Sequence, residues 1–164
     1  MPAARYLAVS AALVGGFVWT GTAAALIVPQ HSIAGVELNM TRPEVRAKKG
    51  EPDRIKHGTN DFGAFTEFTY RNAAGKLRVT FQGNAGATAV FTNRRTQHTA
   101  ERIHVGSTET KLHDAFPGLD CRTESSSFRH CWTGRFRPGH RVTDYRIDMS
   151  ASRVKTILVG FVID

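Results

Sequence analysis

The chain has 164 residues, of which 41% are hydrophobic and 22% are charged. These proportions exclude a wholly disordered chain, because disordered segments have too few apolar residues to bury. Its 22 lysines and arginines outnumber its 14 acidic residues, which gives a formal net charge of +8 at pH 7. Such an excess favours anionic partners: a membrane surface, cell-wall polymers or an acidic protein.

An apolar segment opens the chain. Arg5 is the only charged residue before the uncharged run 6–28, which ends in small residues at 23–25. One early positive charge, an apolar stretch and an alanine-rich site predict a signal peptide over residues 1–25, cleaved after Ala25. The alternative is a retained anchor, because the run is long enough to span a bilayer. Both interpretations place the rest of the chain outside the cytoplasm.

The next segment contains a repeat. The stretch 36–45 returns as 103–112, with its apolar positions and a threonine in register. A fixed repeat of this kind predicts one structural unit built twice. We therefore expect a first repeat over 33–92, a linker over 93–101 and a second repeat over 102–164.

Each repeat is predicted to begin with a short helix. In the first repeat Thr41 and Glu44 have the spacing of a capping box, which predicts a helix over 42–49 that a following glycine and proline end. The second repeat keeps a threonine, Thr108, at the capping position. Its Lys111 stands where the box requires an acid, so a weaker cap is expected there.

Strands are predicted after each helix, because apolar and polar residues alternate between glycine-rich turns. Val45 and Leu112 are expected to pack the helices onto one face of their sheets. The sequence thus predicts an α+β fold made of two tandem helix-plus-antiparallel-sheet repeats. The expected strands cover 65–70, 76–81, 88–92, 127–133, 141–149 and 153–162.

The chain has two cysteines, Cys121 and Cys131. In an oxidising compartment an even number of cysteines at this hairpin-like spacing predicts a disulfide. Two reduced thiols are the alternative. A zinc site is not expected, because no second cysteine pair or histidine spacing completes a set of four ligands.

The stretch 35–45, together with the segment 50–53 that ends the first helix, resembles the opening of the β-lactamase inhibitory protein fold. The small lipoproteins of the outer-membrane assembly machinery share this fold. The resemblance covers about residues 33 to 164 and implies two tandem copies, each with a closely spaced cysteine pair, which Cys121 and Cys131 match in the second copy. Two departures stand out: the first copy has no cysteine pair, and the turn 72–76 is basic where the inhibitors carry an acidic turn.

Catalytic motifs are absent from the sequence. It contains no Gly-x-Ser-x-Gly elbow, no phosphate-binding loop and no His-Glu-x-x-His pattern. The histidines stand singly, so each is expected to be solvated or hydrogen-bonded rather than a ligand or a general base. We expect no enzyme, no cofactor and no metal site, with a small envelope enzyme as a remote alternative. The seven histidines are His31, His57, His98, His104, His113, His130 and His140.

Two turns carry the residues expected to contact a partner. The turn 72–76 is basic, and the segment 134–141 places an aromatic residue between two arginines next to Pro138 and Gly139, which predicts an exposed turn. Aromatic and arginine side chains are frequent binding anchors. A solvated basic surface that only maintains solubility is the alternative. The candidate partner-binding residues are Lys76, Arg135, Phe136, Arg137 and Arg141.

These observations together predict an exported, non-enzymatic binding protein that acts by protein–protein contact in the cell envelope or outside the cell. The two sheets are expected to form one continuous concave surface with the two turns as contact loops. The main alternative is a proteinaceous inhibitor of a secreted enzyme, as the resemblance implies. An acidic protein is the expected partner and an anionic envelope surface the second choice. Nucleic acid is not expected for an exported chain.

Overall fold

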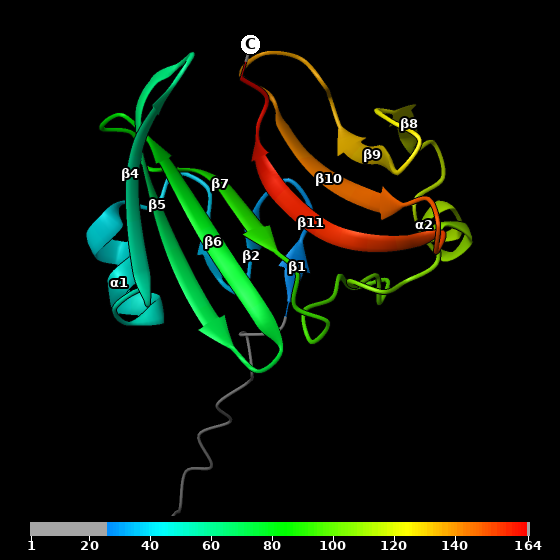
Figure 1. Cartoon of the computed structure of the whole chain (residues 1–164), viewed down its shortest axis with the longest axis horizontal. Helices are drawn as coiled ribbons and strands as arrows, with labels where there is room; N and C mark the ends of the chain where they lie inside the picture. The colour runs from blue at the N-terminus through cyan, green and yellow to red at the C-terminus, as the bar shows by residue number, and fades with distance from the viewer. Residues whose placement is uncertain (1–25, 164) are drawn as a thin grey trace, which may run out of the picture.

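The computed structural model describes residues 26–163. Eight strands form one antiparallel sheet in the order β4-β5-β6-β7-β11-β10-β9-β8, and three short strands form a second sheet, β1-β2-β3 (Figure 1). The bounds are β1 Ile27–Val28, β2 Ser32–Ile33, β3 Val36–Glu37, α1 Arg42–Lys49, β4 Arg54–Asn60, β5 Gly63–Asn72, β6 Gly75–Gln82, β7 Ala87–Thr92, α2 Glu109–Ala115, β8 Asp120–Thr123, β9 Phe128–Gly134, β10 Arg141–Asp148 and β11 Arg153–Phe161.

The predicted α+β fold of two tandem helix-plus-sheet repeats is wrong. Residues 26–163 are mostly β, with 50% of them in strands and 11% in two short helices. The strands of the two predicted repeats do not form one sheet each. They join into a single sheet, because β7 pairs with β11 through Val90 and Val159. Left alone, β7 and β11 would each be an edge strand with unpaired backbone groups, and their pairing satisfies both edges. The expected continuity of the strand surface is confirmed by this pairing.

The first helix begins and ends where the sequence predicts. In α1 the Thr41 hydroxyl accepts a hydrogen bond from the Glu44 backbone N–H, and a Glu44 carboxylate oxygen accepts one from the Thr41 backbone N–H at 2.7 Å. In α2 the Thr108 hydroxyl accepts from the Lys111 N–H at 3.2 Å, with no return bond from a lysine side chain. The expectation of a weaker second cap is confirmed.

All six predicted strands are present, but five further strands have no counterpart in the prediction. Three of them are the short strands β1, β2 and β3. The other two, β4 and β8, are the two edges of the large sheet. Residues of β4 are exposed on both faces apart from the half-buried Gly58, so its sequence lacks the alternation that marks a half-buried strand. β8 is exposed along its whole length.

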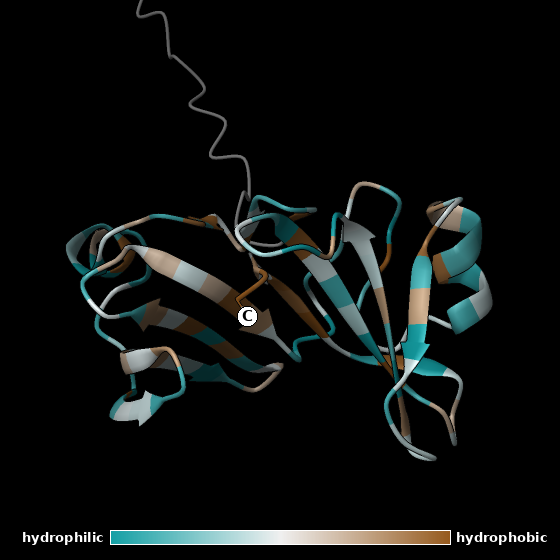
Figure 2. Ribbon diagram, turned by 90° about the horizontal axis from the view of Figure 1, so that it is seen from above, coloured by the Kyte–Doolittle hydropathy of each residue, from teal (hydrophilic) through white to brown (hydrophobic). Residues whose placement is uncertain are grey.

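One face of the large sheet carries the core. Figure 2 shows hydrophobic residues recurring along the central strands. Val45 of α1 and Leu112 of α2 are fully buried, as predicted, and both belong to a single cluster that also contains Phe68 and Tyr145. Because this cluster draws residues from both halves of the chain, the two halves share one core.

The predicted signal peptide, residues 1–25, lies outside the described residues. Across 26–163, neither helix has the length and apolar character needed to cross a membrane.

Candidate functional site

The second face of the large sheet, called the open face here, carries none of the helices or short strands within residues 26–163. α1 packs on the core face, where the Arg46 guanidinium lies 4.9 Å from the Phe68 ring centroid. α2 does the same, with Phe116 5.7 Å from Tyr145. The turn after β1 donates a backbone hydrogen bond to the core-face Thr143 hydroxyl at 2.7 Å. The covering elements therefore all lie on one side.

Strand pairing arranges the open-face side chains in three rows across the sheet, since directly paired residues share a face. The mixed row has two cations and two acids: Arg54, Thr69, Arg78, Phe91, Leu158, Asp144, Trp132 and Asp120. The neutral row is Lys56, Glu67, Thr80, Ala89, Gly160, Val142 and Gly134. The basic row is Arg71, Lys76, Thr156, Arg146, His130 and Arg122.

Stacking between cations and aromatic rings orders the open face. The Arg78 guanidinium lies 4.0 Å from the Phe91 ring centroid and pairs with Glu67 at 3.2 Å. The Arg146 guanidinium lies 3.8 Å from the Phe128 ring centroid. Half-buried pairs of this kind stabilise one orientation of each long side chain. The open face therefore presents aromatic edges and cations in fixed positions.

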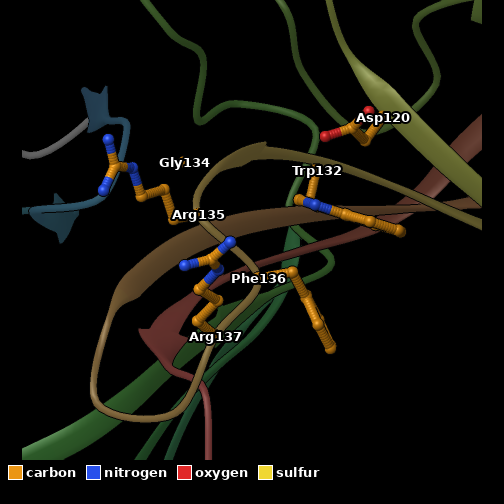
Figure 3. Close-up of a pocket in the computed structure, with 6 residues that line it drawn as sticks. All are labelled: Asp120, Trp132, Gly134, Arg135, Phe136 and Arg137. Atoms are coloured by element: carbon orange, nitrogen blue, oxygen red, sulfur yellow. The ribbon is translucent and has the colours of Figure 1, made fainter.

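A hollow lies where the mixed row ends at β9 and β8. Trp132 and Phe136 stack over it with ring centroids 4.9 Å apart, and Phe136 remains 58% exposed. Figure 3 shows the Trp132 and Phe136 side chains projecting to one side of the loop and Arg135 extending to the other. A planar aromatic pair beside cations suits an apolar group that carries a neighbouring negative charge. The hollow is lined by Asp120, Trp132, Gly134, Arg135, Phe136 and Arg137.

His130 on the open face is held between two carboxylates. Its Nδ1 lies 2.8 Å from an Asp144 oxygen, and its Nε2 lies 2.9 Å from a Glu124 oxygen. Desolvation disfavours the charged imidazole, but the hydrogen bonds and charges of Asp144 and Glu124 outweigh it and raise the pKa of His130. Burial raises the pKa of Asp144, against the opposing effect of His130. Both ring nitrogens are occupied, so this imidazole is not free to act as a base.

Three of the five predicted contact residues meet in this hollow: Arg135, Phe136 and Arg137. Lys76 does not. It belongs to the basic row, about 7 Å along the strands and about 19 Å across them from Trp132 in the hollow, by standard sheet spacings. Arg141 points to the opposite face, where its guanidinium lies 5.5 Å from the Phe161 ring centroid. The predicted set therefore spans two faces of the sheet.

Sequence reasoning missed the residues that complete the hollow and its neighbourhood. Trp132 and His130 are two positions apart in β9. Because side chains alternate between the two faces of a strand, both point to the same face. Their partners Asp120 and Asp144 come from β8 and β10. The four side chains come together only because the three strands pair in this register. If one strand shifted by one residue, its side chain would point to the other face of the sheet.

The predicted disulfide is present. Cys121 and Cys131 are directly paired across β8 and β9 and joined by an S–S bond of 2.07 Å. His113 Nε2 lies 3.8 Å from the Cys121 sulfur. Because both sulfurs are bonded to each other, neither is a thiolate that could join His113 in binding a metal ion.

Comparison with known proteins gives a fold and no family. No family model matches this chain, and no curated protein matches it. Among solved structures it is similar to an extracellular protein containing an SCP domain from Bacillus anthracis str. Ames, with a TM-score of 0.56 and 9% sequence identity. The match covers 76% of this chain but 44% of that one, so this chain spans less than half of the other protein. At this identity the similarity shows a shared fold alone.

Proposed function

We propose that this chain is an exported, non-enzymatic binding protein that acts by protein–protein contact in the cell envelope or outside the cell. The observation that carries the proposal is the open face, an ordered sheet surface on which half-buried aromatic and charged side chains lie uncovered. Phe136, the most exposed of the large hydrophobic side chains within residues 26–163, stands at its margin. Exposed aromatic residues beside arginines are typical of binding anchors.

The open face has the size of a protein interface. Eight strands at the usual spacing are about 34 Å across, and strands of seven or eight residues are about 24 Å long. The resulting area of about 800 Å² equals what one partner contributes to a standard protein–protein interface. The face therefore has room for a protein surface.

Export is supported by the Cys121–Cys131 disulfide, which uses both cysteines of the chain. Structural disulfides form and persist in oxidising compartments and are rare in the cytosol. The apolar residues 1–25 supply the expected export signal.

The side chains around His130 order part of the open face. The ring of His130 is held by two carboxylates, those of Asp144 and Glu124, which come from different elements. These hydrogen bonds fix the positions of charged groups that a partner would meet.

The proposal is tested by replacing Phe136 and Arg137 with alanine together. Capture of the native partner from envelope extract should weaken by more than tenfold, about 1.4 kcal/mol. The melting temperature should hardly change, since Phe136 is mostly exposed. The matched control replaces Leu26 and Arg95, two exposed residues of segments that lie off the open face, and should leave capture intact. Unchanged capture by the Phe136 and Arg137 variant would overturn the proposal.

A proteinaceous inhibitor of a secreted enzyme is the second candidate, favoured by the exposed Phe136, an aromatic side chain that an enzyme cleft could bind. It uses the same surface. A screen against secreted hydrolases, β-lactamases included, separates the two, because an inhibitor lowers turnover in proportion to occupancy and a simple binding partner does not. Phe136→Ala should relieve any inhibition found.

A further inference from the structure

Charge is distributed unevenly along the strands of the open face. The mixed and neutral rows each carry equal numbers of cations and acids. The basic row carries four lysines and arginines and no acid, and it crosses both halves of the sheet. Arg71, Lys76 and Arg122 are exposed, and none of the three has an ion-pair partner within residues 26–163. Most of the uncompensated charge of the open face therefore lies in this one row.

Two cations of the basic row oppose each other directly. Arg71 and Lys76 are a paired position of β5 and β6, where like charges are unfavourable. Arg146 is partly compensated by Glu124 at 4.0 Å, and Glu124 is 61% exposed. The free protein thus retains repulsion that a bound carboxylate would relieve.

The opposite end of the sheet carries exposed aromatic side chains. Phe136 follows the neutral row at β9, and Phe62 lies in the turn after β4, at the same end of the strands. They are 58% and 44% exposed, and Ile163 near the chain terminus is 42% exposed. Along the strands, the unpaired cations of the basic row therefore lie at one end, and exposed aromatic side chains lie at the other, where Phe136 stands between Arg135 and Arg137.

We infer that the partner is a protein whose contact surface is acidic where it meets the basic row and apolar where it meets the Phe136 end. The inference rests on the proposed function, because it names the chemistry of that partner. Complementary charge at one end and an apolar anchor at the other fix the orientation of the bound protein.

A protein fits this pattern better than a uniformly anionic surface does. Asp144 is paired with His130 and Asp148 with Lys155, whereas Asp120 of the mixed row is exposed beside the basic row. An anionic bilayer or polymer would meet Asp120 as well as the cations and be repelled by it. A protein surface can place its carboxylates opposite the cations alone.

The test uses two synthetic peptides of identical composition. One has its glutamates at one end and its leucines and phenylalanines at the other, and the second has them interspersed. Binding is followed by fluorescence anisotropy in about 0.1 M salt, where charges separated by more than about 10 Å are largely screened. The segregated peptide should bind at least tenfold more tightly. Equal binding of the two peptides would overturn the inference.

Charge-reversed variants locate the binding. The double variant Arg71→Glu and Lys76→Glu should weaken binding of the segregated peptide by more than tenfold. Lys48→Glu with Arg95→Glu changes net charge equally off the open face and should weaken it less than twofold. Equal losses would show that overall charge is responsible and would overturn the inference. Tighter binding to phosphatidylglycerol vesicles than to the peptide would assign the row to a membrane instead.

These outcomes are separable from those of the proposed function. If the Phe136 and Arg137 variant loses the native partner while the Arg71 and Lys76 variant keeps it and binds peptide normally, the protein-binding function stands and the acidic chemistry of the partner is wrong. If the Phe136 and Arg137 variant keeps the native partner, the binding function itself fails.

Discussion

At the scale of single residues, His130 makes the open face sensitive to pH. It lies in the basic row with Asp144 and Arg146 facing it from β10, Arg122 paired to it from β8, and Glu124 bonded to it from beyond β8. Its raised pKa means that the folded protein binds the imidazole proton more tightly than the unfolded chain does.

Stability should therefore depend on His130 protonation. The extra stability is complete below the unfolded pKa of about 6.5 and is lost as pH rises through the raised pKa of the folded state. His130→Gln should remove this dependence. Urea midpoints between pH 5.5 and 8.5 should fall more steeply for the wild type than for this variant. His140→Gln, in an exposed loop, serves as the control and should keep the wild-type profile; parallel curves for wild type and His130→Gln would refute the assignment.

At the scale of elements, each helix is attached to the sheet by one fully buried aliphatic side chain, Val45 or Leu112. Truncating either to alanine should destabilise the protein by about 2 to 4 kcal/mol, as the removal of buried methyl groups does elsewhere. Lys48→Ala and Thr110→Ala, at exposed positions of the same helices, should cost under about 0.5 kcal/mol. Chemical denaturation measures all four, and similar losses throughout would mean that the helix faces are misassigned.

The disulfide is a covalent link between the edge strand β8 and its neighbour β9. This edge strand pairs only with β9, and all its residues are exposed. Replacing Cys121 and Cys131 with alanine should cost about 3 kcal/mol by the chain-entropy estimate for such a short loop. Hydrogen exchange should accelerate in 120–123 and remain slow in β6. Equal acceleration in both strands would show that the bond stabilises the whole sheet rather than its edge.

The sequence was sufficient for elements with a local signal and insufficient for those without one. The capping residues Thr41 and Glu44 place α1 correctly, because both partners of the cap lie within four positions. The exposed β4 carries no alternation, so nothing local distinguishes it from a loop. The fold class was wrong because the pairing of Val90 with Val159 depends on strands distant in sequence. The hollow was half predicted: Phe136 has a local turn signal, whereas Trp132 and Asp120 meet only through register.

At the scale of the whole molecule, the shared core predicts a single cooperative unfolding transition. The buried cluster includes Val45 and Phe68 from the first half and Leu112 and Tyr145 from the second. Calorimetry should give a calorimetric enthalpy equal to the van't Hoff enthalpy. Two resolved transitions, or retention of structure in a fragment ending at residue 101, would show that the halves fold independently.

The pairing of β7 with β11 also affects when the sheet can form during synthesis of the chain. β11 is synthesised well after β7, so β7 keeps an unpaired edge until 153–161 arrives. Sheets closed by contacts so distant in sequence form slowly, and their open edges are prone to associate meanwhile. The interval before β11 pairs with β7 is therefore when the chain most needs a chaperone.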